Sequence, residues 1–394
     1  MAVALDDRER AMLAGEAGDG AALAMRLVLV AAEALGAERL IPITRAHVDS
    51  CLYHGQATLD FVRRLQEGGA RVSVPTTLNV GAVDLLHPEL WRGDPETAAR
   101  GRELMEAYRS LGCRPTFTCA PYQLADARPG LGEQVAWAES NAIVFCNSVL
   151  GARTERYGDF TDIACAITGR VPDAGLHRTD ARRAVLVLRP AADIPVALLH
   201  DDAFYPVLGV LLGERAGSRV AALDGLPTAL SEDRLKAVGA AAASSGAVAI
   251  FHAVGSTPEA PTLEAALQGG AADEVAEYGM AELRAIAAEL AGAPVADGVE
   301  LLVSTSRDVL ETAEHEGVAR RLREAGAELL VDTCSYLGPI LRPTPLPVMT
   351  DSGKWAWYAP ANIGARVVFA SRRECLRSAV GGLLWRDDRL WGDA

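Results

Sequence analysis

Hydrophobic and polar residues along the chain follow two alternating spacings. Apolar residues three or four positions apart, the spacing of an amphipathic helix, recur between short continuous runs rich in Val, Leu and Ile. Such runs are typical of strands in a parallel sheet whose two faces are covered by helices. The pattern therefore predicts an α/β fold in which several parallel or mixed sheets are flanked by helices.

In the first part of the chain the two spacings predict the following elements. Helices are expected at residues 6–14, 21–35, 55–67, 95–111 and 133–139. Strands are expected at residues 39–43, at 71–75, directly before Cys119 and at 142–146. Polar residues follow several of these strands, as in the segment 44–51, which we interpret as a turn.

From residue 183 onward the alternation becomes more regular. Strands are expected at 184–188, 219–223, 247–252, 300–304, 328–331 and 366–370, and helices at 203–215, 230–243, 280–290 and 307–325. The change near residues 169–181 predicts a boundary between an N-terminal α/β region, 1–180, and a C-terminal α/β region, 181–394.

The charge and the cysteines narrow the class of protein. A net charge of −14 gives no basic surface for nucleic acid and no general attraction to anionic membranes. The longest apolar run, 22–35, contains Arg26 and Glu33, so it does not predict a membrane span. Seven widely spaced cysteines and no recognisable signal peptide predict a cytoplasmic protein without a disulfide framework.

Two cysteines, Cys119 and Cys334, follow predicted strands and precede polar segments. In open α/β sheets ligands bind at the carboxyl ends of strands, so two thiols there suggest a shared metal site. Thiolates suit iron, iron–sulfur clusters and zinc. Cys51 and Cys146 also border polar segments. A lone cysteine is more often a small buried hydrophobe, and from position alone that alternative stays open.

The densest polar cluster is residues 147–154, which follows the strand predicted at 142–146. Asn147, Ser148, Arg153 and Thr154 surround Gly151, and the guanidinium of the arginine could bind a carboxylate with two hydrogen bonds. The alternative is a loop whose serine caps a helix and whose arginine pairs with a surface acid. Spacing alone does not decide between them.

Histidine and lysine supply further candidates. His47 and His54 flank Cys51 and could orient a substrate or donate a proton. Only two residues are lysines, Lys236 and Lys354. Lys354 follows a glycine, but the phosphate-loop pattern around it is absent, and no dinucleotide fingerprint follows a strand.

Eight segments, taken together and in order, resemble the large subunit of the aconitase X family. They are residues 11–16, 45–51, 118–122, 139–142, 147–154, 158–162, 332–334 and 352–354. The resemblance implies aconitase-like domains 1 to 3 with the site at the domain interface. It also implies a separate small swivelling-domain subunit as a partner, which would supply a catalytic serine.

The family resemblance implies an iron cofactor. Cys119 and Cys334 match the family's cysteine positions, and the context of Cys51 makes it the predicted third metal ligand, with Cys146 as the alternate. The expected group is a [2Fe-2S] cluster, and mononuclear iron is the alternative. The CxxC pair of the aconitases with a labile [4Fe-4S] cluster is absent.

The resemblance further implies a dehydratase, that is, a hydro-lyase, with a small carboxylate substrate. Its bacterial branch removes water from cis-3-hydroxy-L-proline to give a Δ2-pyrroline carboxylate, and this is the predicted reaction. Its archaeal branch dehydrates mevalonate 5-phosphate, which is the alternative. A metal-free, non-catalytic relative is a third possibility from another class.

Residue roles follow from the same resemblance. The predicted catalytic residues are Lys354, His54 and Ser148. The predicted substrate-binding residues are His47, Thr77, Asn147, Ser148, Arg153 and Thr154.

Overall fold

The computed structural model describes residues 3–278, 300–335, 339–341 and 347–387. The chain forms two compact units. The first contains residues 1–146, 152–181 and 302–341, and the second contains 147–151, 182–301 and 342–394. Each unit is therefore assembled from three separate stretches of the chain.

The first unit is built around a parallel sheet of three strands in the order β3–β2–β4. These strands are β2 (Ala46–Val48), β3 (Thr76–Leu78) and β4 (Ala136–Trp137). Two smaller sheets pair β1 (Leu40–Pro42) with β5 (Arg170–Pro172), and β10 (Leu301–Ser304) with β11 (Ala327–Leu330). The helices are α1 (Asp7–Leu13), α2 (Asp19–Ala34), α3 (Gln56–Glu67), α4 (Pro95–Ser110), α5 (Ser140–Phe145), α6 (Thr161–Thr168), α12 (Arg307–His315) and α13 (Val318–Glu324).

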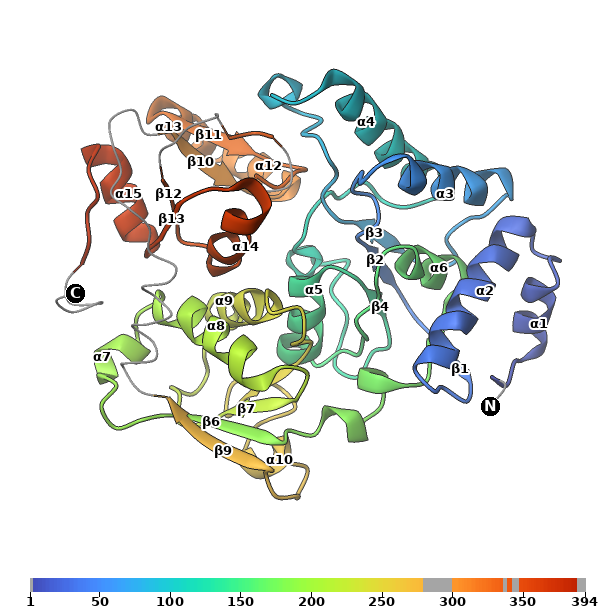
Figure 1. Cartoon of the computed structure of the whole chain (residues 1–394), viewed down its shortest axis with the longest axis horizontal. Helices are drawn as coiled ribbons and strands as arrows, with labels where there is room; N and C mark the ends of the chain where they lie inside the picture. Colours follow the sequence, from blue (N-terminus) through green and yellow to red (C-terminus); the bar gives the residue numbers. More distant parts are fainter. Residues whose placement is uncertain (1–2, 279–299, 336–338, 342–346, 388–394) are drawn as a thin grey trace. The chain divides into compact units, whose positions relative to one another are not determined.

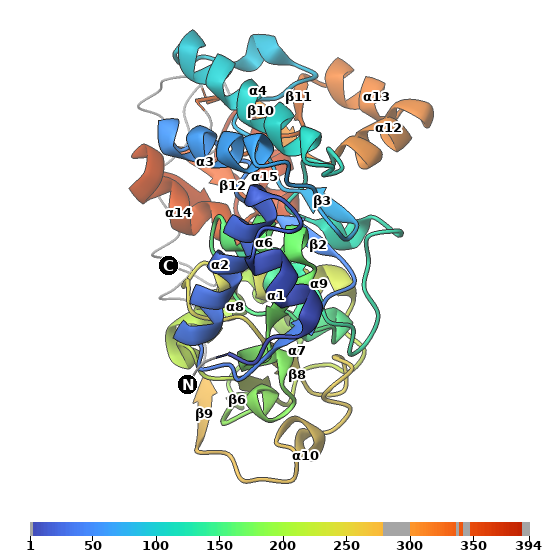
Figure 2. The ribbon, with the colours of Figure 1, turned by 90° about the vertical axis from the view of Figure 1, so that its right-hand side faces the viewer.

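The core of the first unit lies between these helices and the three-stranded sheet. Helix α2 packs on α6, α6 packs on β2, and α3 packs on α4. Figure 2 shows α1 and α2 side by side. Met25, Val28, Leu59 and Tyr108 are fully buried in this core. Burial of such side chains is the main force that holds the unit together.

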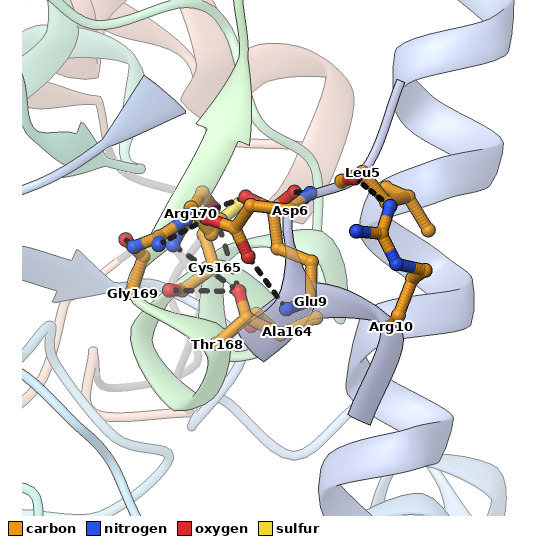
Figure 3. Close-up of polar contacts among 9 residues, drawn as sticks. All are labelled: Leu5, Asp6, Glu9, Arg10, Ala164, Cys165, Thr168, Gly169 and Arg170. Atoms are coloured by element: carbon orange, nitrogen blue, oxygen red, sulfur yellow. Dashed lines mark hydrogen bonds and ion pairs between the residues drawn. The ribbon is translucent and has the colours of Figure 1, made fainter. Parts of the chain in front are cut away.

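An ion-pair cluster attaches the N-terminal helix to the rest of the first unit (Figure 3). Arg170, at the start of β5, donates hydrogen bonds to Glu9 at 2.7 Å and to Asp6 at 3.2 Å. Asp6 and Glu9 also cap α1 reciprocally, each side chain accepting the backbone N–H of the other. One arginine thus fixes both the start of α1 and its position on β5.

The second unit contains a parallel sheet of four strands in the order β8–β7–β6–β9. These are β6 (Leu186–Pro190), β7 (Ala221–Leu223), β8 (Phe251–Ala253) and β9 (Glu274–Tyr278), and β12 (Val348–Thr350) pairs with β13 (Val367–Phe369). The helices are α7 (Val196–Leu199), α8 (Phe204–Ala216), α9 (Glu232–Ala243), α10 (Leu263–Ala266), α14 (Gly353–Ile363) and α15 (Arg372–Gly381).

Helices α8 and α9 lie side by side, as Figure 1 shows. Gly209 permits this close packing, because a Cβ at that position would stand 2.4 Å from the carbonyl oxygen of Val238. None of the helices in the described parts of the chain is both long and apolar enough to span a bilayer.

The structure confirms the predicted α/β class with parallel sheets, and most of the helices. Two adjacent assignments were wrong. The helix expected at 133–139 contains strand β4, and the strand expected at 142–146 is helix α5 followed by a π-helical turn, Cys146–Leu150. A four- or five-residue apolar run that is buried on all sides looks the same in a strand and in a buried helix.

Other boundaries also differ from the prediction. The residues expected as a strand at 71–75 are irregular, and β3 begins at Thr76. The residues before Cys119 form no strand, because Phe117 has a φ of +42°. The helix expected at 307–325 is two helices, which Gly317 separates with a φ of +68°. The helix expected at 280–290 lies outside the described residues.

Candidate functional site

Polar side chains of the first unit gather where the three parallel strands end. Asp49 follows β2, Asn79 follows β3 and Glu139 follows β4. In the sheet His47 stands opposite Thr77 on one side and opposite Trp137 on the other. Because all three strands run in the same direction, their carboxyl ends meet at one edge, where α/β proteins bind ligands.

His47 is fully buried at this edge of the sheet. Its Nδ1 is 2.9 Å from the hydroxyl of Thr77, whereas its Nε2 has no hydrogen-bond partner in the part of the chain that the structure describes. Burial lowers the pKa of His47 to about 4, against the opposing charge of Glu139, so the ring is neutral at pH 7. A buried nitrogen without a partner is costly, which makes the Nε2 a natural contact for a bound ligand.

Buried carboxyl groups surround the same edge. The side chain of Asp49 accepts a hydrogen bond from the Asn79 amide. Burial, and next the charge of Glu139, raise the pKa of Asp49 to about 7. Asp162 accepts hydrogen bonds from the Ser50 hydroxyl at 2.6 Å and from the Asp49 N–H at 2.7 Å, and burial raises its pKa to about 6. So many acids in one place favour a cation nearby.

Cys51 lies against the chain that leaves β3. Its thiol is fully buried and donates to the carbonyl oxygen of Asn79 at 3.1 Å and to that of Val80 at 3.7 Å. Burial, and next the charge of Asp49, raise the pKa of the Cys51 thiol well above its usual range. This sulfur stays protonated unless a cation compensates its charge.

The other two predicted metal ligands border the same stretch, Leu78–Gly81. Next to Cys119, the Thr118 N–H donates to the Leu78 carbonyl at 3.2 Å. Two residues before Cys334, the Asp332 carbonyl accepts the Gly81 N–H at 2.9 Å. Cys119 and Cys334 are both partly exposed. The Cys51 thiol and the backbone segments that lead to Cys119 and Cys334 thus all contact one short stretch of the first unit.

A buried polar atom without a partner accompanies each of these cysteines. For Cys51 this atom is the Oδ1 of Asn79, the residue whose carbonyl oxygen the thiol contacts. For Cys119 it is the Oδ1 of Asn141, whose amide nitrogen donates to the Cys119 carbonyl at 3.3 Å. For Cys334 it is the Oγ1 of Thr333, the residue directly before it. Among the described residues no three His, Cys, Asp or Glu side chains are arranged as a ready metal site. The donor type and the unpartnered atoms nevertheless fit an iron group.

Asn147 and Ser148 lie in the second unit, on the π-helical turn rather than after a strand. The Asn147 amide donates to the Ala249 carbonyl at 3.1 Å and accepts from Arg182 at 2.9 Å. The Ser148 hydroxyl accepts the Phe251 N–H at 2.9 Å. Both residues are buried and fasten the turn to the chain that enters β8. Their predicted contacts with substrate stay predictions.

Arg153 and Thr154 belong to the first unit. Arg153 donates to the His177 carbonyl at 2.9 Å and to the Thr179 hydroxyl at 2.9 Å, while its Nε is buried without a partner. The Thr154 hydroxyl accepts the Trp137 N–H at 3.0 Å and so extends the edge of β4. Both side chains bind neighbouring protein groups, and their substrate-binding roles stay predictions.

Three further candidates lie elsewhere. His54 is exposed, and Cys146 is fully buried at the start of the π-helical turn. Lys354 is the second residue of α14, whose first turn Ser352 caps. Gly353 lets that turn approach α8 and α9 closely, since a Cβ there would stand 3.1 Å from Pro206.

Sequence reasoning missed four residues of the site edge: Asp49, Asn79, Glu139 and Asp162. Three of them lie within segments that carried the family resemblance, 45–51, 139–142 and 158–162. Their place in these family segments was the signal that could have identified them. The neighbouring residues in the sequence do not distinguish these acids from acids on the surface. Their burial, 4% exposure for Asn79 and none for Asp162, is a property of the folded unit alone.

Three family models cover almost the whole chain. The model described as Aconitase X first domain matches residues 2–180, that described as Aconitase X second domain matches residues 185–288, and that described as Aconitase X third domain matches residues 277–381. The solved structure of Thermococcus kodakaraensis aconitase X in its holo-form superimposes with a TM-score of 0.84 at 29% identity. The superposition covers 96% of this chain and 100% of the Thermococcus chain.

Curated relatives carry two different names. The cis-3-hydroxy-L-proline dehydratase of Pseudomonas aeruginosa is 43% identical over 96% of this chain and 70% of its own length. The protein of that name from Hypocrea jecorina is 38% identical over 97% of this chain and 69% of its own length. The phosphomevalonate dehydratase large subunit of Methanosarcina mazei is 33% identical over 96% of this chain and 97% of its own length.

Proposed function

The chain belongs to the aconitase X family, and we propose that it is the large subunit of a hydro-lyase that dehydrates cis-3-hydroxy-L-proline. The observation that carries this proposal is the 43% identity with the P. aeruginosa dehydratase of that name, against 33% with the M. mazei phosphomevalonate dehydratase subunit. The product is a Δ2-pyrroline carboxylate. A cytoplasmic location accords with this role.

Mevalonate 5-phosphate is the second candidate substrate. The M. mazei phosphomevalonate dehydratase subunit is 33% identical over 97% of its length, and the P. aeruginosa dehydratase is 43% identical over 70% of its length. We give the higher sequence identity more weight, so mevalonate 5-phosphate stays the second candidate.

We assign iron to Cys119 and Cys334, with Cys51 as the third ligand and a [2Fe-2S] cluster as the form. The support is that the Cys51 thiol and the segments leading to Cys119 and Cys334 contact Leu78–Gly81, and that a buried polar atom without a partner among the described residues lies in a residue next to or bonded to each cysteine. Iron held by these three cysteines would supply a Lewis acid for the leaving hydroxyl group.

The carboxyl groups at the strand ends are suited to move the proton. Dehydration removes a proton from the carbon next to the carboxylate and a hydroxyl group from the neighbouring carbon, and together these leave as water. We assign proton removal to Asp49 with Glu139 beside it, because the Asn79 amide fixes the aspartate at the edge of the sheet. The neutral His47 presents its Nε2 to the substrate, and the buried setting excludes water.

We further propose that the chain acts with a small swivelling domain carried on a separate subunit. The support is that the M. mazei relative is named a large subunit. The predicted roles of Lys354 and His54 in the completed site remain part of this proposal, whereas the catalytic role of Ser148 stays a prediction, because its hydroxyl already accepts the Phe251 N–H.

The test is to purify the chain anaerobically with its small subunit and to assay both substrates. We expect iron in the protein, a visible absorption band, and water elimination from cis-3-hydroxy-L-proline. Activity on mevalonate 5-phosphate alone would replace the substrate assignment with the second candidate. A colourless, metal-free complex that dehydrates neither substrate would instead indicate a non-catalytic relative.

A further inference from the structure

Arg307 occupies an unusual place for an arginine. It is the first residue of α12, directly after the capping residue Ser306. The amino end of a helix carries partial positive charge, so a cation there weakens the helix rather than supporting it. Its position is therefore explained by what its guanidinium contacts.

The first contact is with the segment that leads to Cys334. The Arg307 guanidinium donates two hydrogen bonds to Asp332, at 2.6 Å and 2.7 Å, in the forked geometry that only arginine provides. Asp332 is 1% exposed and has a φ of +62°, which is strained for a residue other than glycine. The backbone of Gly81 donates to its carbonyl. The arginine thus holds a strained, buried residue two positions before a cysteine.

The second contact is with the segment that leads to Cys119. The centre of the Arg307 guanidinium lies 5.2 Å from the centroid of the Phe117 ring, within the range of a cation–π interaction. Phe117 is 1% exposed and has a φ of +42°, which is again strained for a bulky side chain. Phe117 also stands two positions before a cysteine.

The two cysteine segments therefore share one construction. In each, a residue with positive φ precedes the cysteine by two positions and lies against the same guanidinium. We infer that Arg307 is a positioning residue that holds the Cys119 and Cys334 segments together, so that both thiols can bind one iron group. The part of this inference that concerns iron binding rests on the proposed function.

Thiol labelling of the metal-free full chain tests the positioning role without any metal. In Arg307→Met we expect Cys119 and Cys334 to react with a maleimide about tenfold faster or more, because two charge-assisted hydrogen bonds are lost. Phe117→Leu should accelerate Cys119 alone and Asp332→Asn should accelerate Cys334 alone. Arg320→Met, on the neighbouring helix with an exposed ion pair, is the matched control and should label as the wild type does.

Iron release to a chelator is the second measurement. We expect Arg307→Met to lose iron about tenfold faster or more than the wild type, and Arg307→Lys to be intermediate, since it keeps the charge without the fork. Unchanged labelling and unchanged iron release in Arg307→Met would overturn the inference. If the wild type holds no iron, the proposed function fails, and the labelling rates alone test whether Arg307 positions the two cysteine segments. If Arg307→Met does not fold, the segment-specific labelling of the Phe117 and Asp332 variants decides.

Discussion

The two units each contain a parallel sheet with buried polar residues beside it, and the two groups differ in where and how they are bonded. In the first unit, Asp49, Asn79 and Glu139 lie at the carboxyl ends of the strands. In the second, Asn147 and Ser148 bind backbone groups at the amino end of β8. Ligands bind at carboxyl ends in such sheets, so position alone separates the two groups.

The hydrogen bonds also distinguish the polar residues of the first unit from those of the second. Arg182, 1% exposed, donates to Glu259, to the Asn147 side chain and to the Asn147 carbonyl, so the protein itself uses these polar groups. In the first unit the His47 Nε2 and the Asn79 Oδ1 are buried and lack partners among the described residues, and in the second unit the same holds for the His252 Nδ1 on β8. The Asn147 and Ser148 side chains are thus already bonded to the protein, whereas the open atoms of either unit need a partner that a bound ligand or water can supply.

The largest effect should come from the cysteines of the first unit. Cys119→Ser and Cys334→Ser should abolish bound iron and all dehydration, because each removes a ligand that we propose for the metal. Cys375→Ser, a partly exposed cysteine on α15 in the second unit, should keep both. Metal analysis and the visible spectrum check this.

The third ligand is decided in the same way. Cys51→Ala should lose the iron and Cys146→Ala should retain it, since the Cys51 thiol contacts the carbonyl oxygens of Asn79 and Val80 in the Leu78–Gly81 stretch. The reverse result would exchange the two cysteines, and retention of iron in both variants would remove both from the ligand set.

Removal of the carboxyl groups at the strand ends should come next. Asp49→Asn and Glu139→Gln should lower kcat by about 10²- to 10⁴-fold, the usual contribution of a positioned acid or base. Glu259→Gln, an acid of the second unit that pairs with Arg182, should leave kcat near the wild-type value and lower stability instead. Steady-state kinetics and urea denaturation separate the two outcomes. Equal losses of kcat in all three variants would erase the distinction between the units.

The pH dependence of stability should reveal the buried acids of the first unit. The pKa of Asp162 is raised in the folded protein from 3.8 to about 6, so its contribution is fully present below pH ~4 and is lost as the pH rises through about 6. At about 1.4 kcal/mol per pKa unit, the wild type should lose at most about 3 kcal/mol relative to Asp162→Asn over that range.

Urea denaturation at several pH values measures this difference. Asp233→Asn, with a side chain 92% exposed, is the control and should show a constant difference from the wild type. A difference that grows in favour of the wild type as the pH rises would mean that the Asp162 carboxylate is stabilised, and not penalised, by its surroundings.

The fold could be predicted where the pattern was long. Described helices of twelve or more residues, such as α2, α4 and α9, repeat their apolar spacing often enough to be recognised. Strand β4 has two residues and α5 has six, and α5 begins because the Glu139 side chain accepts the Ala142 N–H. Elements this short carry too little periodicity, and the region 133–146 was consequently assigned in the wrong order.

The site could be predicted only in part for a different reason. Cys119 and Cys334 stand out because thiols are rare and their segments carry family motifs. Asp49 and Glu139 lie at the same sheet edge because β2 pairs with β4. In this pairing His47 stands opposite Trp137, ninety positions later in the sequence, and each acid lies two residues after the member of this pair on its own strand. Arg307 likewise acquires its meaning from two contacts with distant segments. No local pattern encodes such pairings.

The smallest effect expected is in the second unit. Ser148→Ala removes the hydroxyl that accepts the Phe251 N–H at 2.9 Å and leaves a buried donor at the amino end of β8 without its partner. The free energy of unfolding should fall by about 2 kcal/mol, the usual cost of such a group. If the hydroxyl serves structure alone, kcat should change little in the complex with the small subunit. If Ser148→Ala instead lowers kcat by about 10²-fold or more at unchanged stability, the hydroxyl acts on the substrate, and the division between a structural and a chemical sheet edge has to be redrawn.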